Sequence, residues 1–128
     1  MTKMTNPTSS LAQTQPLSPD VPHFMAEAST SGINHIYDGP FEFFVGGGGA
    51  SFDCNGDRLP ELFLAGGTNE AGFYINQSPS NGDLKFTQAT LIESEANPIN
   101  VTGAYAINID NVQYTDLIIL RVGENLIY

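Results

Sequence analysis

The fold is decided by a stretch from Gly48 to Leu64, which reads GGASFDCNGDRLPELFL. A second stretch from Gly103 to Ile119 reads GAYAINIDNVQYTDLII and aligns with the first at an offset of 55 residues. Each contains a short apolar segment, a polar loop and a second apolar segment. Short runs of β-branched and aromatic residues between Gly, Asn, Asp and Pro are typical of strands. The alignment therefore predicts two copies of one strand, loop and strand unit.

The rest of the chain contains further short segments of the same kind and no sustained helical period. Four short antiparallel strands per copy form the unit of a β-propeller blade, and such units bury their faces by stacking on neighbours. The sequence therefore predicts an all-β fold, a β-propeller fragment with one complete four-stranded blade (48–90) and most of a second (101–128). The expected strands are Gly48–Phe52, Glu61–Ala65, Gly72–Asn76, Leu84–Thr87, Val101–Ile107, Asp116–Val122 and Asn125–Tyr128.

Composition and charge limit the classes of partner. The 128 residues include 14 Asp and Glu but only 4 Lys and Arg, which gives a formal net charge of -10. Nucleic acid is excluded as an expected partner, because its binding needs cationic side chains that displace counterions from phosphates. Bound cations would relieve the self-repulsion of so acidic a chain.

The first part of the chain differs in composition from the rest. Residues Met1 to Pro22 are rich in Ser, Thr, Pro, Gln and Asn and contain few aliphatic side chains. Such a segment buries too little apolar surface to offset the conformational entropy lost on folding. We therefore expect a disordered leader or linker before the β repeats at 23–128. The sequence shows no secretory signal and no apolar run long enough for membrane insertion.

The polar loop of the first copy has the composition of a calcium site. Its side-chain oxygens alternate along the chain at Asp53, Asn55 and Asp57, and Glu61 follows at the ninth position. Calcium takes six to eight oxygen ligands. Together with the carbonyl of Leu59, these residues would supply five or six oxygens, and water would complete the shell. The loop therefore predicts a calcium site.

An EF-hand is a different calcium loop with a similar beginning. It needs an acidic residue at the twelfth position and a helix on each side. The twelfth position counted from Asp53 is Leu64, which lies in a predicted strand. An EF-hand is therefore excluded.

The spacing instead resembles the FG-GAP or VCBS-type repeat, whose loops read Asp-x-Asp/Asn-x-Asp-Gly-x-x-Asp between two strands of a blade. Four stretches are most similar to the cartilage acidic protein and ASPIC/UnbV branch of that group: Phe24–Tyr37, Phe44–Asp53, Pro60–Gly66 and Gly72–Asn76. The resemblance implies a propeller with structural calcium. The chain departs from the pattern at Arg58, where the family has Gly, and at Glu61, where it has Asp.

The loop of the second copy is a weaker candidate for calcium. Its equivalent positions are occupied by Asn108, Asp110, Val112, Gln113 and Asp116. Val112 removes one ligand oxygen, and Asn108 in place of Asp removes one charge. The alternative is a solvated acidic turn that only joins two strands.

Three other features of the sequence have simpler explanations than a catalytic or ligand-binding role. Gly46–Gly49 lacks the Lys that a phosphate-binding loop needs, and the simpler role is a flexible entry to an inner strand. Cys54 with His23 or His35 lacks a supporting nucleophile and base motif. The last feature, an aromatic group expected in the core between two blades, contains Phe41, Phe43 and Phe44.

The leading hypothesis from the sequence is a non-enzymatic, calcium-stabilised module of a larger exported or cell-surface protein. Its partners would be extracellular proteins or glycans, and the remaining propeller blades would be missing from this chain. One alternative is a piece of a propeller enzyme such as a hydrolase or lyase, which would need catalytic groups from several blades. Another is a truncated product without activity of its own.

Overall fold

The computed structural model describes residues 21–92, 96–112 and 114–128, which form two antiparallel β-sheets and little helix. The predicted all-β class is therefore confirmed. Most of the predicted leader lies outside the described residues, and its last two residues, Val21 and Pro22, have no regular structure. No helix among the described residues has the length and hydropathy needed to cross a membrane.

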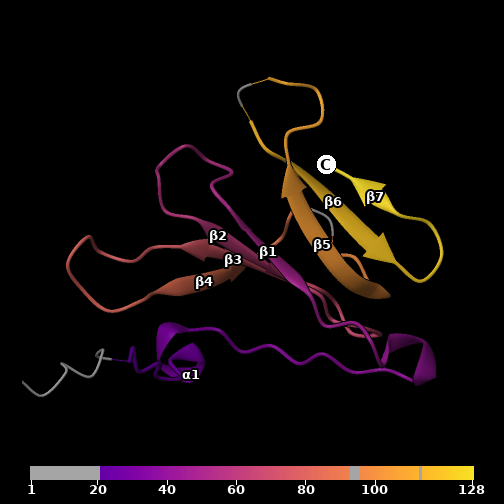
Figure 1. Cartoon of the computed structure of the whole chain (residues 1–128), viewed down its shortest axis with the longest axis horizontal. Helices are drawn as coiled ribbons and strands as arrows, with labels where there is room; N and C mark the ends of the chain where they lie inside the picture. The colour runs from indigo at the N-terminus through magenta and orange to yellow at the C-terminus, as the bar shows by residue number, and fades with distance from the viewer. Residues whose placement is uncertain (1–20, 93–95, 113) are drawn as a thin grey trace, which may run out of the picture.

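The first sheet has four strands in the order of the sequence (Figure 1). Each strand follows its neighbour through a hairpin, so every pairing is antiparallel. All four were expected from the sequence within three residues at each end. The strands are β1 (Gly49–Phe52), β2 (Glu61–Leu64), β3 (Gly72–Asn76) and β4 (Phe86–Ala89).

The second sheet has three strands, again in sequence order. It lies beside the first sheet, with β5 packed against β1 (Figure 1). The strands are β5 (Val101–Ile107), β6 (Asp116–Arg121) and β7 (Leu126–Ile127).

The hairpins β1–β2 and β5–β6 have the same register. Ala50 lies opposite Phe63 in the first, and Tyr105 lies opposite Ile118 in the second. Both numbers in the second pair exceed those in the first by 55, and the other three pairs of β1 and β2 have partners at the same offset. The offset that aligns the two stretches of sequence therefore also relates their backbone hydrogen bonding.

The hydrophobic core lies between the two sheets, and the sheets use opposite faces to form it. We call face A of the first sheet the side that presents Phe52, Phe63 and Phe73, which are all buried. Side chains directly opposite each other in antiparallel strands share a face. The residues of β5 and β6 at the positions of face A do not enter this core. The second sheet instead contributes its other face, face B, with Ala104, Ala106, Leu117, Ile119 and Leu126.

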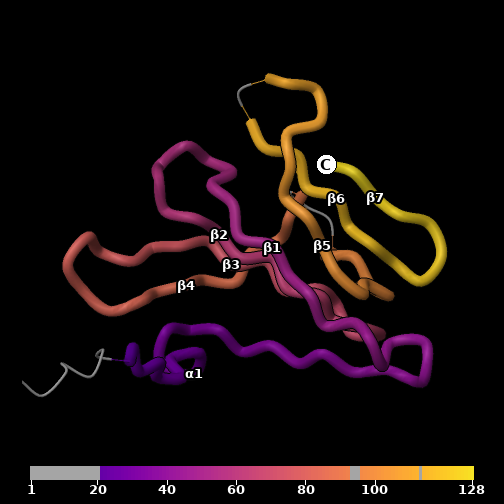
Figure 2. The backbone as a smooth tube through the Cα atoms, in the orientation of Figure 1, coloured from indigo at the N-terminus to yellow at the C-terminus, as the bar shows by residue number. Residues whose placement is uncertain are grey.

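Face B of the first sheet is covered by the chain that precedes β1. This segment includes the single-turn helix α1 (Ala28–Ser31) and runs along the first sheet on the side away from the second (Figure 2). The hydroxyl of Tyr74 donates to the carbonyl of Asn34 at 2.8 Å, and Nε2 of His35 lies 2.7 Å from the carbonyl oxygen of Ala65. A β-carbon at Gly32 would meet the carbonyl oxygen of Phe86, so glycine permits this close approach.

The prediction for the aromatic group is wrong at two of its three positions. The short helix η1 (Phe41–Phe43) places Phe43 in the interior, but Phe41 and Phe44 are exposed and contact each other with ring centroids 5.6 Å apart. Residues three apart lie on the same side of a 3₁₀ turn. Phe41 and Phe44 therefore share the outer side, and only Phe43 is directed inward.

Candidate metal centre

The loop between β1 and β2 is organised by its acidic side chains. Asp53 accepts hydrogen bonds from the backbone N–H groups of Gly56 at 2.7 Å and Arg58 at 2.9 Å, one on each carboxylate oxygen. Arg58 has a φ of 71°, so it adopts the left-handed conformation that glycine favours. This conformation costs a non-glycine residue roughly 1 kcal/mol, and Arg58 stands at the position where the FG-GAP pattern has Gly.

Three of the predicted ligands lie close together. The side-chain nitrogen of Asn55 is 3.0 Å from Oδ2 of Asp57 and 3.4 Å from Oε1 of Glu61. Glu61 has no exposed surface, and its Oε2 accepts a hydrogen bond from the N–H of Cys54 at 2.9 Å. The amide of Asn55 therefore stands between two carboxylates and offsets part of their repulsion.

The other two predicted ligands lie differently. Backbone N–H groups bind both carboxylate oxygens of Asp53. Leu59 donates its N–H to Oδ1 of Asp57 at 2.7 Å. Within the described part of the chain, no three His, Cys, Asp or Glu side chains gather closely enough to hold a metal ion. The loop is thus arranged around its own backbone donors.

The second loop has the same backbone arrangement with fewer acids. Oδ2 of Asp116 accepts from the N–H of Ile109 at 2.8 Å, as Glu61 does from Cys54. Oδ1 of Asp110 accepts from the N–H of Val112 at 3.1 Å.

Two further features place the second loop in the same class of turn. The side-chain amide of Asn108 donates to the carbonyl of Val112 and so closes the loop. These two residues occupy the positions of Asp53 and Asp57 in the first loop. Asn111 has a φ of 60°, and Gly56, its equivalent, has a φ of 81°. Gln113, the remaining predicted position, lies outside the described residues. The turn therefore forms without the acidic residues at the positions of Asp53 and Asp57.

Cys54 is not placed as a nucleophile. Partial burial and the neighbouring Glu61 carboxylate raise the pKa of its thiol to about 11. His35 lies in the segment that covers face B of the first sheet, and its ring makes an edge contact with Tyr74. His23 is exposed in the segment before α1.

The raised pKa leads to a first prediction. A pKa near 11 in place of 9.0 leaves roughly 100-fold less thiolate near neutral pH, and the thiolate is the reactive form. Iodoacetamide at pH 7.5 is therefore expected to alkylate Cys54 far more slowly in the folded protein than in the same protein unfolded in urea. Equal rates, followed by mass spectrometry, would contradict a raised pKa of this thiol beside Glu61.

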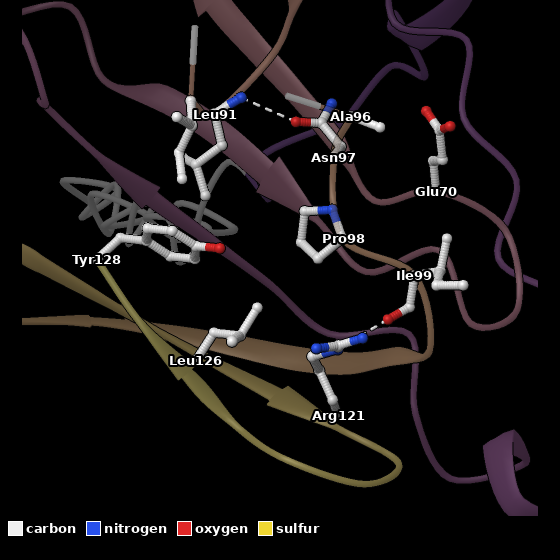
Figure 3. Close-up of a pocket in the computed structure, with 10 residues that line it drawn as sticks. Glu70, Leu91, Ala96, Asn97, Pro98, Ile99, Arg121, Leu126 and Tyr128 are labelled. Atoms are coloured by element: carbon white, nitrogen blue, oxygen red, sulfur yellow. Dashed lines mark hydrogen bonds between the residues drawn. The ribbon is translucent and has the colours of Figure 1, made fainter. Parts of the chain in front are cut away.

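A hollow of about 340 Å³ lies between the loop after β4 and the second sheet (Figure 3). Nε of Arg121 donates to the carbonyl of Ile99 at 2.9 Å. The side chain of Asn97 accepts from the N–H of Leu91 and donates to the carbonyl of Ala89. Its described lining residues include no Ser, Cys or His. Sequence reasoning did not find this hollow, because its residues come from segments that are distant in the chain and share no motif.

No protein-family model, no curated protein and no solved structure matches this chain.

Proposed function

We propose that this chain is a non-enzymatic, calcium-stabilised β-propeller module of a larger binding protein. The observation that supports it best is the shared architecture of the two hairpins, whose registers and loop hydrogen bonds are related by 55 residues. Units repeated in this way bury their faces by stacking. The packing of face A of one sheet on face B of the next is the head-to-tail arrangement that a ring of blades requires.

The metal part of the proposal depends on the donors of the first loop. Asp53, Asn55, Asp57 and Glu61 and the carbonyl of Leu59 would hold calcium, which prefers carboxylate, amide and carbonyl oxygens. Glu61 is buried, and the amide of Asn55 lies within hydrogen-bond distance of both Glu61 and Asp57, so the loop brings two carboxylates to one amide. Bound calcium would offset this charge and pin the hairpin between β1 and β2.

The second loop is proposed as a linking turn. Its equivalent donors are Asn108, Asp110 and Asp116, with Val112 at the position of Asp57. Fewer carboxylates lower the charge that attracts a divalent cation. Calcium is therefore expected to bind the first loop in preference.

The charge of the chain bears on where the parent protein acts. A net charge of -10 suits a calcium-rich exterior and disfavours contact with nucleic acid. We place the parent protein outside the cell or at its surface, where the loops of a complete propeller would bind proteins or glycans.

Isothermal calorimetry tests the metal site. Calcium is titrated into the wild-type chain and into a double variant, Asp53→Ala with Asp57→Ala, and thermal melts of both are recorded with calcium and with EDTA. Binding near one equivalent, with a calcium-dependent rise in Tm, is expected for the wild type only. The matched control is Asp110→Ala in the second loop, which should leave one equivalent bound. Lack of binding by the wild type at millimolar calcium would reject the site.

A further inference from the structure

The two sheets differ in how their A faces are covered. Phe52, Phe63 and Phe73 of the first sheet are buried against the second sheet. Pairing places their counterparts on one face of the second sheet, since Ile118 lies opposite Tyr105 and Ile127, as Phe63 lies opposite Ala50 and Phe73. The counterparts on face A of the second sheet are Ile107, Ile118 and Ile127.

These counterparts have apolar side chains and less cover than those of the first sheet, and Ile118 is half-buried. Ile107 is 46% exposed and Ile127 is 65% exposed, and Tyr105 beside them is also exposed. A hollow of about 540 Å³ lies beside Tyr105 and Leu120, and residues before β1 such as Val45 also line it. The apolar pattern of a buried face is therefore present on a surface that meets solvent.

The opposite end of the structure is closed. Face B of the first sheet is covered by the segment that contains Asn34 and His35, which contacts Tyr74 and Ala65. A second copy of this chain therefore has no free face B on its first sheet to offer. Its second sheet uses face B in the core already described.

We propose that face A of the second sheet is the docking surface for the sheet of a further repeat, which follows this one head to tail. The occupant would present a face B of small and aliphatic side chains, as Ala104, Leu117 and Ile119 do toward the first sheet. Three positions support this occupant, because Ile107, Ile118 and Ile127 repeat the apolar character of Phe52, Phe63 and Phe73. The inference rests on the stacking part of the proposed function and does not depend on calcium.

The chain offers its own test sequence. Tyr128 exchanges two backbone hydrogen bonds with Leu117 at 2.8 and 3.1 Å, as Tyr74 pairs with Leu62 in the first sheet. Tyr128 thus stands where Tyr74 stands. A second copy of residues 75–128 placed directly after Tyr128 would therefore continue the repeat and supply both a fourth strand and a further sheet.

The readout is the reactivity of one cysteine on the docking surface. In a Cys54→Ala background, Ile127→Cys is introduced once, both in the 128-residue chain and in the extended chain. Ile127 is the counterpart of Phe73, which is buried in the first sheet. Labelling of this cysteine by a thiol reagent is expected to slow by about tenfold or more in the extended chain, since labelling would then require local opening.

Two variants of the extended chain complete the test. Ile118→Asp places a charge on the docking surface and should restore fast labelling. Asn125→Asp adds the same charge in the turn before β7 and should leave labelling slow. Circular dichroism of the 128-residue chain with each substitution checks that the two sheets still form.

Two results would overturn the inference. One is equal labelling rates in the short and extended chains. The other is a dimer of the short chain in sedimentation velocity that Ile118→Asp dissociates, because the occupant would then be a second copy. The outcomes are separable from the calorimetry: calcium binding without protection rejects only the docking surface, and protection without calcium binding rejects only the metal site.

Discussion

Phe63→Ala is expected to lower the free energy of unfolding of the protein by about 3 to 5 kcal/mol. Phe63 has no exposed surface, lies between Ala50 and Phe73 on face A, and faces the second sheet. Removing a buried Phe costs about 3 to 5 kcal/mol through lost transfer free energy and the cavity left behind. The free energy of unfolding of a small domain is about 5 to 15 kcal/mol in total. A large part of the stability of so small a core would therefore be lost.

Urea unfolding followed by circular dichroism measures this effect. The matched control is Phe41→Ala, the same change at a residue that is 80% exposed and contacts the ring of Phe44. A surface substitution of this kind is expected to stay within about 0.5 kcal/mol. Similar free energies of unfolding for the two variants would contradict a single core formed between the sheets.

Asn55→Asp is expected to change stability in opposite directions with and without calcium. The substitution removes the amide donor that lies 3.0 Å from Asp57 and 3.4 Å from Glu61, and it adds a fourth carboxylate to the loop. Without a divalent cation the repulsion among these groups is no longer offset, so Tm should fall. With calcium the added charge should tighten binding by about tenfold, which corresponds to roughly 1.4 kcal/mol.

Thermal melts and calcium titrations of this variant are compared with those of Asn125→Asp. Asn125 lies in the turn between β6 and β7, and its side-chain oxygen accepts from the N–H of Arg121, a contact that Asp can keep. The control adds the same charge away from the loop and should leave calcium affinity unchanged. A variant at Asn55 that neither loses stability in EDTA nor gains affinity would show that the loop acids do not act on a common centre.

The strands and the two hairpins follow from local sequence. Short β-branched and aromatic runs, bounded by turn residues, predicted all seven strands to within three residues at each end. The 55-residue alignment also predicted which residues form equivalent hairpins, because side-chain alternation with a period of two leaves one register that keeps apolar residues on a common face. The alternating oxygens of the first loop likewise identified Asn55, Asp57 and Glu61 as neighbours.

Other features depend on the tertiary structure. Periodicity alone does not say which face of a sheet meets which neighbour, so the burial of Phe63 and Phe73 and the exposure of Ile127 were not predictable from either sheet alone. The same holds for Phe41 and Phe44, whose exposure follows from a single 3₁₀ turn. The orientation of Asp53 toward the backbone of Gly56 and Arg58 is another such feature, because competing N–H donors were not visible in the spacing of oxygens.

The sequence by itself determined the all-β class, the strand positions and the common register of the two hairpins, because these depend on neighbours along the chain and on alternation within a strand. Only the tertiary structure decided that residues before β1 close one face of the first sheet while an apolar face of the second sheet stays open. The physical reason is that burial depends on contacts between segments far apart in sequence, and identical local patterns can be covered in one copy and exposed in the next.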